Sequence, residues 1–169
     1  LTEKGIVSPE DMFDYISYKG RDNARTPMQW NDGPQAGFTE GTPWIAVNPN
    51  YREINAKEQM ERESSVFQYY KKLIRLRKEH EIIVYGDYEL LLPDSEELYV
   101  YLRKYRDEKL LVICNYTEQE TAFRIPEELR GRTAELLISN YDKDTAGMAD
   151  AGQEILLRPY EAAAVLYKE

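Results

Sequence analysis

The ten residues 21–30 (RDNARTPMQW) gather the side chains best suited to bind a polar ligand. The guanidinium groups of Arg21 and Arg25 flank the carboxylate of Asp22. A guanidinium presents five donors in one plane and stays charged at any working pH, so it suits recognition of hydroxyl or carboxylate oxygens. The run has neither a helical nor a strand period. We therefore predict a loop, the kind of segment that carries binding groups on a rigid scaffold.

Other residue types that commonly do chemistry are sparse. Cys114 is the single cysteine and lies in the apolar run 110–114. No basic residue adjoins it to lower its pKa, so we predict a buried structural thiol and no disulfide within the chain. His80 is the single histidine, at a predicted helix end where a positive imidazole complements the dipole. Because this pair cannot form a usual zinc site, we expect no metal and no cofactor.

Two further patterns are weaker. Asp142, Asp144 and Asp150 alternate with small residues in a predicted loop, but their spacing lacks the pattern of a calcium loop. A solvated acidic loop is the favoured interpretation. The triplet 115–117 (NYT) matches a glycosylation acceptor. It directly follows a strand-like run and no secretion signal is present, so we interpret it as a chance match.

Composition bounds the function. A net charge of −9 leaves no basic patch for phosphates, which argues against a nucleic-acid partner. No apolar run reaches the ~20 residues that cross a bilayer, so we expect no membrane span. With the lone thiol, this favours a cytoplasmic location. The chain has 14 tyrosines, which suit half-buried strands as well as sugar binding, and packing is the favoured role.

Two helices and seven strands are predicted. Ser8 and Pro9 start a first helix that Gly20 ends. The segment 21–52 is irregular but rich in aromatics, which predicts an ordered excursion. A second helix covers 64–79. Its apolar face is predicted to hold Val66, Phe67, Tyr70, Leu73, Ile74 and Arg77. The predicted strands are 84–91, 98–105, 109–116, 120–125, 133–139, 153–157 and 162–167, a spacing typical of an antiparallel sandwich with Greek-key connections.

Many blocks of the chain resemble one family. Besides 21–30 they are 36–38 (AGF), 43–45 (PWI), 47–51 (VNPNY), 54–55 (IN), 69–74 (YYKKLI), 76–78 (LRK) and 157–162 (LRPYEA). Together they resemble the carboxyl-terminal third of oligo-1,6-glucosidases and related α-glucosidases of the α-amylase superfamily, glycoside hydrolase family 13. The likeness covers nearly the whole chain, with the blocks in the expected order. The start at Leu1, without a methionine, fits an excised piece of such an enzyme.

The resemblance implies an α+β fragment. Residues 1–81 would be the last loop and helix of a (β/α)8 catalytic barrel, and residues 82–169 an antiparallel β-sandwich domain. Active sites of such barrels lie among the loops after the strands. Retaining enzymes of this type use two carboxylates about 5–5.5 Å apart. In the family these precede the region matched here, so we expect no catalytic residue in this chain and no activity of the chain alone.

The resemblance also implies the site residues. Arg25 would hydrogen-bond a hydroxyl of the non-reducing glucose and pair with an upstream carboxylate. Asp22 and Asn23 would bind the same sugar or hold the arginine, and Arg21 would instead pair with a barrel carboxylate. The alternative is that both arginines only tie the loop to the barrel rim. Gln29 and Trp30 are predicted to anchor the loop, and Trp44 is predicted to pack, with stacking on a sugar as the alternative.

Several functions stay open. The leading hypothesis is part of an α-glucosidase that acts on short 1,6-linked oligosaccharides, reached through the parent barrel. Within the resemblance, a trehalose-6-phosphate hydrolase, a maltose-preferring α-glucosidase or a sucrose isomerase is also possible. From a different class, the chain would be a stand-alone sugar-binding or structural β module. The charges of the loop argue against this module, because a small sandwich offers them no partner. The oligomeric state is not predicted.

Overall fold

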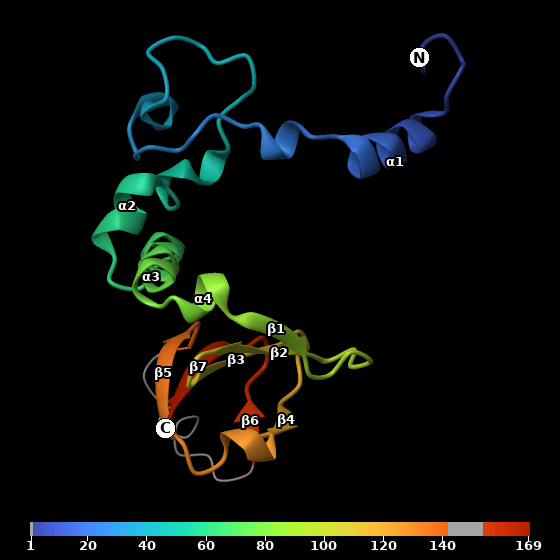
Figure 1. Cartoon of the computed structure of the whole chain (residues 1–169). Coiled ribbons are helices and arrows are strands. Elements are labelled where there is room, and N and C mark those ends of the chain that lie inside the picture. The colour runs from blue at the N-terminus through green and yellow to red at the C-terminus, as the bar shows by residue number, and fades with distance from the viewer. Residues whose placement is uncertain (1, 142–153) are drawn as a thin grey trace. The chain divides into compact units, whose positions relative to one another are not determined.

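The computed structural model describes residues 2–141 and 154–169. The chain forms two compact units, residues 1–68 and 69–169, called here the N-terminal and C-terminal units (Figure 1). The predicted acidic loop with Asp142, Asp144 and Asp150 lies outside the described residues.

The N-terminal unit begins with helix α1 (Pro9–Lys19), as predicted. The Ser8 hydroxyl accepts a hydrogen bond from the Asp11 N–H at 3.0 Å, and Pro9 occupies the first turn. The Gly20 N–H donates to the Ile16 carbonyl and closes the last turn. None of its residues is buried, and Phe13 is 72% exposed, so α1 has no packing partner within its unit.

The irregular excursion 21–52 and the residues that follow it before α3 contain four short elements. They are the 3₁₀ turns η1 (Asp22–Ala24), η2 (Pro34–Gly37) and η3 (Pro49–Arg52) and the helix α2 (Ala56–Glu61). Helix α2 was not predicted. Asn55 caps it by accepting from the Glu58 N–H at 3.0 Å. A helix this short has too few apolar positions to show a period, which explains the omission.

The main helix is α3 (Val66–Glu79), close to the predicted 64–79. The Ser65 hydroxyl accepts from the Gln68 N–H at its start. Of the predicted apolar face, Leu73 lies beside the sheet, whereas Tyr70 is 64% and Ile74 46% exposed in the described chain. Within the C-terminal unit, the stripe that packs on the sheet instead contains Tyr69 and Leu76.

A short helix joins α3 to the sheet. The predicted strand 84–91 begins as α4 (Ile82–Tyr85) and becomes β1 (Asp87–Leu90) only after Gly86. A Cβ at Gly86 would lie 2.6 Å from the Ile82 carbonyl oxygen and 3.2 Å from the Arg103 Cβ. Arg103 donates from Nη2 to the Gly86 carbonyl at 2.6 Å and from Nε to the Ile82 carbonyl at 3.1 Å. The helix-to-strand junction is therefore held by the second strand.

The seven predicted strands are present among the described residues. After β1 come β2 (Leu98–Tyr105), β3 (Glu108–Asn115), β4 (Thr121–Arg124), β5 (Thr133–Ser139), β6 (Glu154–Leu157) and β7 (Ala162–Lys168). One antiparallel sheet has the order β1-β2-β3-β7-β5, and β4 pairs with β6 in a second sheet. Because β7 lies between β3 and β5, the connections cross between the sheets, as predicted for a Greek-key sandwich (Figure 1).

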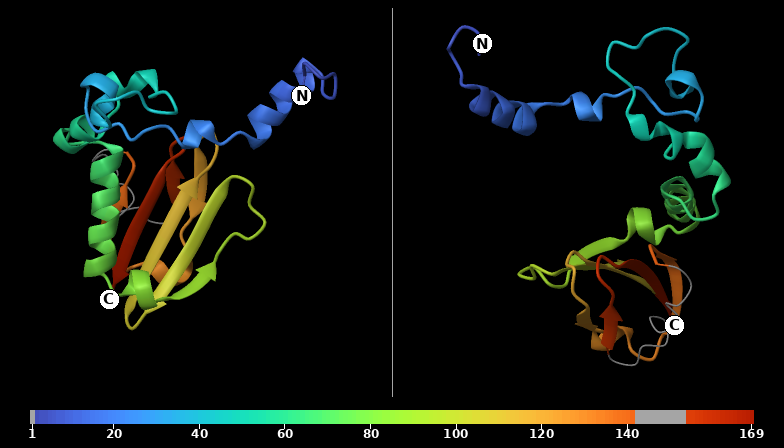
Figure 2. Two further views of the ribbon diagram at one scale, coloured as in Figure 1. Left: turned by 90° about the horizontal axis from the view of Figure 1, so that it is seen from above. Right: turned by 180° about the vertical axis from the view of Figure 1, so that it is seen from behind.

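Two apolar layers hold the C-terminal unit together. Between the sheets, Val100 and Leu102 pack with Phe123 and Leu157. On the other face of the five-stranded sheet, α3 and α4 pack through Leu76 and Ile82 (Figure 2). Side chains alternate between these layers along β2, as period-two patterning requires.

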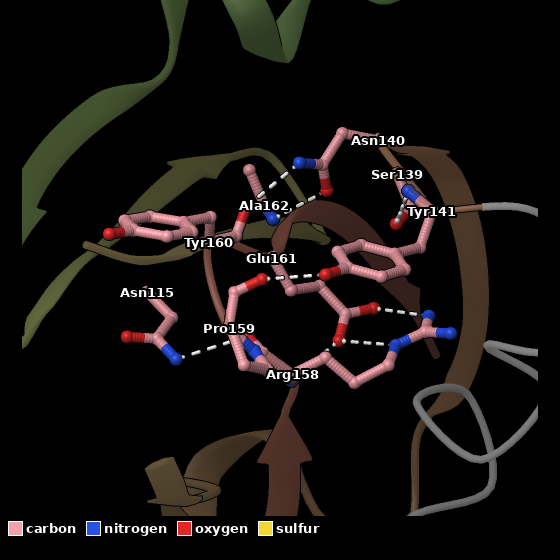
Figure 3. A network of polar contacts seen from close by, with 9 residues as sticks. All are labelled: Asn115, Ser139, Asn140, Tyr141, Arg158, Pro159, Tyr160, Glu161 and Ala162. Atoms are coloured by element: carbon pink, nitrogen blue, oxygen red, sulfur yellow. Dashed lines mark hydrogen bonds and ion pairs between the residues drawn. The ribbon is translucent and has the colours of Figure 1, made fainter. Parts of the chain in front are cut away.

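A polar network closes the turn between β6 and β7 (Figure 3). The carboxylate of Glu161 accepts from Arg158 at Nη2, Nε and the backbone N–H. The Tyr141 ring lies 4.0 Å from the Arg158 guanidinium carbon, and its hydroxyl donates to the Pro159 carbonyl at 2.7 Å. Asn115 donates from Nδ2 to the Arg158 carbonyl at 3.0 Å. The network thus links the ends of β3, β5 and β6 to the start of β7.

Candidate functional site

The three predicted site residues lie together on one exposed turn. The Ala24 N–H donates to the Arg21 carbonyl and the Arg25 N–H to the Asp22 carbonyl, both at 3.0 Å, and these bonds define η1. The side chains of Arg21, Asp22 and Arg25 are exposed. None of the three makes an ion pair or a side-chain hydrogen bond within residues 2–141 and 154–169. Their charges are free to engage an external group.

The chain becomes firmly held just after this turn. Pro27 is buried, and Gln29 donates from Nε2 to Asn50 Oδ1 at 3.0 Å and to the Ile54 carbonyl. These contacts confirm the anchoring predicted for Gln29. Trp30 is held through its backbone, since its ring is 53% exposed. Residues 21–25, called here the arginine turn, therefore have exposed side chains, while the chain that follows them is attached to the rest of the unit.

The next residues form a left-handed turn. Gln35, Ala36 and Gly37 have φ values of 52°, 55° and 66°. Such a conformation costs a non-glycine residue about 1 kcal/mol or more. It is retained here because the Ala36 carbonyl accepts from both the Trp30 and Asn31 N–H groups, at 2.9 and 3.2 Å, while the Ala36 side chain is fully buried. A Cβ at Gly37 would lie 2.4 Å from Asn31 Nδ2, so a side chain there would have to displace Asn31.

An open cavity of about 940 Å³ lies within the N-terminal unit. Its walls include Asp32, Gln35, Trp44 and Arg52. The prediction that Trp44 packs is wrong for the described chain, because its side chain is 87% exposed. Residues 38–47 are all exposed or half-buried, so this segment offers the ring no buried apolar neighbour along the chain.

The other candidates in the described chain are structural. Cys114 is half-buried and not fully buried as predicted, and this burial raises the pKa of its thiol. Asn115 is 3% exposed and donates from its amide to two carbonyls, of Gln119 and Arg158, so the sequon residue is fully engaged. His80 ends α3, where its N–H donates to the Leu76 carbonyl.

Residues 2–141 and 154–169 contain no cluster of three or more His, Cys, Asp or Glu that could hold a metal ion. No helix in that part of the chain is long and apolar enough to cross a membrane.

Comparison with known families accounts for both units. Residues 1–86 match the family model described as alpha amylase, catalytic domain, and residues 88–163 match the maltogenic amylase C-terminal domain. The chain belongs to the alpha-amylase family. It carries the end of the catalytic domain, with the loop and last helix of the (β/α)8 barrel, followed by the antiparallel β-sandwich, as the resemblance implied.

Similar proteins point to glycoside hydrolases. The chain is 56% identical to the oligo-1,6-glucosidase of Parageobacillus thermoglucosidasius over 154 residues, 91% of this chain and 27% of that protein. It is 43% identical to the trehalose-6-phosphate hydrolase of Bacillus subtilis, over 95% of this chain and 28% of that protein. The chain thus spans less than a third of the length of these relatives.

Solved structures of related enzymes superpose on nearly the whole chain. The trehalose-6-phosphate hydrolase of Bacillus licheniformis superposes with a TM-score of 0.86 at 44% identity, over 98% of this chain and 30% of that one. An isomaltulose synthase of Erwinia rhapontici superposes with a TM-score of 0.85 at 34% identity, over 99% of this chain and 29% of that one.

Three asparagines that hold the loop in place were not predicted. Asn48, Asn50 and Asn55 build the turn that receives Gln29. The signal available for Asn55 was its spacing to Glu58, an asparagine followed three residues later by an acid, typical of a helix start. No local pattern pairs Gln29 with Asn50, which lies 21 residues away.

Proposed function

We propose that this chain is part of a retaining α-glucosidase that removes terminal 1,6-linked glucose from short oligosaccharides. The observation that carries the proposal is the exposed turn with Arg25, whose guanidinium has no described partner in a chain that belongs to the alpha-amylase family. Proteins named oligo-1,6-glucosidase, at 56%, 52% and 48% identity over at least 90% of this chain, support the substrate class.

In this proposal the chain binds substrate and does not cleave it. Arg25 donates hydrogen bonds to a hydroxyl of the terminal glucose and pairs with a carboxylate of the barrel. Asp22 accepts from the same sugar or orients the arginine, and Arg21 pairs at the barrel rim. The nucleophile and the general acid, about 5–5.5 Å apart in retaining enzymes, come from parts of the relatives that this chain does not span. The chain alone is therefore inactive.

We further propose a division at residues 81 and 82. Residues 1–81 complete the catalytic barrel, and residues 82–169 form the β domain that supports it. The family boundary near residue 87 supports this division, while the compact units of the structure divide between residues 68 and 69 because α3 packs on the sheet. We also propose a reducing compartment, in keeping with the unpaired thiol of Cys114.

A chimera tests the proposal with this chain's own residues. The segment of the Parageobacillus thermoglucosidasius oligo-1,6-glucosidase that aligns with this chain is replaced by it. We expect the chimera to hydrolyse isomaltose and nitrophenyl α-glucoside, and the chain alone to hydrolyse neither. Arg25→Ala should lower kcat/KM by about 10- to 100-fold, the effect of losing charge-assisted hydrogen bonds. Full activity of the Arg25→Ala chimera would reject the assignment.

A trehalose-6-phosphate hydrolase is the second candidate, favoured by the 44% identity to the Bacillus licheniformis structure. The two functions differ in the substrate phosphate. The full-length gene product should therefore be assayed with isomaltose and with trehalose 6-phosphate in parallel. Cleavage of only the phosphorylated sugar would replace the leading proposal, while leaving the role of the arginine turn intact.

A further inference from the structure

We propose that Gln29 is a positioning residue, which sets the location of Arg25 by fastening the arginine turn to the segment 48–56. This inference rests on the proposed function of Arg25. It concerns a residue that needs no contact with the substrate, because its side chain is engaged with the protein.

The amide of Gln29 serves two acceptors. Its Nε2 atom donates to Asn50 Oδ1 at 3.0 Å and to the backbone carbonyl of Ile54. Both acceptors are themselves fixed, since the Asn50 N–H donates to Asn48 Oδ1 at 3.1 Å and the Ile54 N–H donates to the Asn50 carbonyl at 2.9 Å. The contact therefore joins Gln29 to an already ordered turn.

The backbone beside Gln29 makes a second attachment. The first N–H groups of a helix lack partners within it. In α2, the Ala56 N–H donates to the Gln29 carbonyl at 2.8 Å and the Lys57 N–H donates to the Trp30 carbonyl at 3.0 Å. The chain after the arginine turn thus caps the start of α2. Side chain and backbone together fix both the position and the direction of residues 29–30.

Only a short, stiff stretch separates this anchor from Arg25. Pro27 lies between them, is buried, and has its φ restricted by its ring. On the other side, the Arg25 N–H is bonded to the Asp22 carbonyl. Since only three residues separate Arg25 from Gln29 and the middle one is the buried Pro27, we expect a displacement of Gln29 to move Arg25. A displacement of about 1 Å at a substrate-positioning group is enough to lower a rate by about 100-fold.

The chemistry of the anchor requires an amide. A glutamate of the same shape has no N–H to donate and would place negative charge against two acceptor oxygens. Gln29→Glu should therefore detach the anchor with little change in volume. Gln68→Glu is a matched control, because Gln68 in the same unit also donates from Nε2 to a backbone carbonyl, that of Met60, at 2.8 Å.

The test uses the chimera described above, with isomaltose as substrate. We expect Gln29→Glu to lower kcat/KM by about 10- to 100-fold and Gln68→Glu to change it by less than about 2-fold. Gln29→Met, which is uncharged, should show a loss in the same direction. Gln29→Met also replaces the glutamate variant in the test if that variant does not fold. Circular dichroism and the thermal midpoint establish that each variant is folded.

The deciding measurement combines two substitutions. If Gln29 acts through Arg25, then Gln29→Glu in an Arg25→Ala background should cause no loss beyond that of Arg25→Ala, because coupled residues are not additive. Additive losses, or wild-type activity in both Gln29 variants, would overturn the inference. A fully active Arg25→Ala chimera would instead reject the proposed function, so the two failures are distinguishable.

Discussion

Arg158 and Glu161 form a two-pronged ion pair at the turn between β6 and β7. Nη2 lies 2.7 Å from Oε1 and Nε lies 3.0 Å from Oε2, while only 1% of Glu161 is exposed. The carboxylate also accepts from the Arg158 backbone N–H at 2.8 Å. A buried carboxylate is stable only when it is paired and its oxygens are satisfied. This pair meets both conditions in a turn whose Tyr160 has a φ of 53°.

Glu161→Gln should therefore destabilise the protein by about 3 kcal/mol, the lower end of the range for breaking a buried pair. The lower end applies because the Arg158 side chain is 35% exposed and keeps part of its hydration. Urea unfolding followed by circular dichroism measures the change. As a control, Lys168→Ala removes an exposed pair with Glu135 and should cost less than about 1 kcal/mol. Equal effects of the two substitutions would contradict the assignment.

Asn115→Asp tests the second group in this network. The Asn115 amide donates to the Gln119 carbonyl at 2.7 Å and to the Arg158 carbonyl at 3.0 Å, and aspartate loses both donors. We expect a loss of about 1–3 kcal/mol for the unsatisfied buried carbonyls. The same engagement predicts that the sequon remains unmodified when the chain is secreted from a glycosylating host. A mass shift by a glycan at Asn115 on the folded protein would refute that expectation.

Glu128 makes a pH-dependent contribution to the free energy of unfolding. Hydrogen bonding from Lys109, followed by that from Lys104, lowers the pKa of Glu128 below its ordinary value of 4.5. A carboxylate with a lowered pKa stabilises the fold above its unfolded pKa, and this stability is lost as the pH falls through the folded value. The group is partly exposed, so we expect less than about 1 kcal/mol. Glu128→Gln should lower the unfolding free energy at pH 7 and have no effect at pH values well below 4.5.

A cavity of about 200 Å³ lies between α3 and the five-stranded sheet, lined by Tyr69, Leu73, Val112 and Ala164 among others. Filling an apolar void restores lost packing contacts. Ala164→Val should raise the thermal midpoint by a few degrees, equivalent to about 1 kcal/mol. Val165→Ile is the comparison, because Val165 is buried in the layer between the sheets and does not line the cavity. There the added methyl group should cost about 1–3 kcal/mol by overpacking.

The strands were predictable because their chemistry is local. Val100 and Leu102 alternate with tyrosines, and the observed β2 (Leu98–Tyr105) has the predicted bounds. The face of α3 that packs on the sheet could not be predicted in the same way. Two apolar stripes run along this helix, and only the position of the sheet selects the one with Tyr69 and Leu76. Strand β1 was predicted too early because residues 82–85 are as apolar as a strand.

For the candidate site too, one part could be predicted from the sequence and another could not. The composition of residues 21–30 was enough to single out Arg21, Asp22 and Arg25, and their role in substrate binding stays a prediction. What holds them could not be predicted, because the link between Gln29 and Asn50 depends on how the chain returns 21 residues later.

Gly86 lies where the two family matches meet, and Arg103 holds the chain at this point. The matches to the two families end at residue 86 and begin at residue 88. Arg103 reaches back from β2 to bind the carbonyls of Ile82 and Gly86 on the catalytic side of that boundary. The segment at the join between the two family matches is thus cross-linked to the sandwich by one arginine, so α4 and β2 move together.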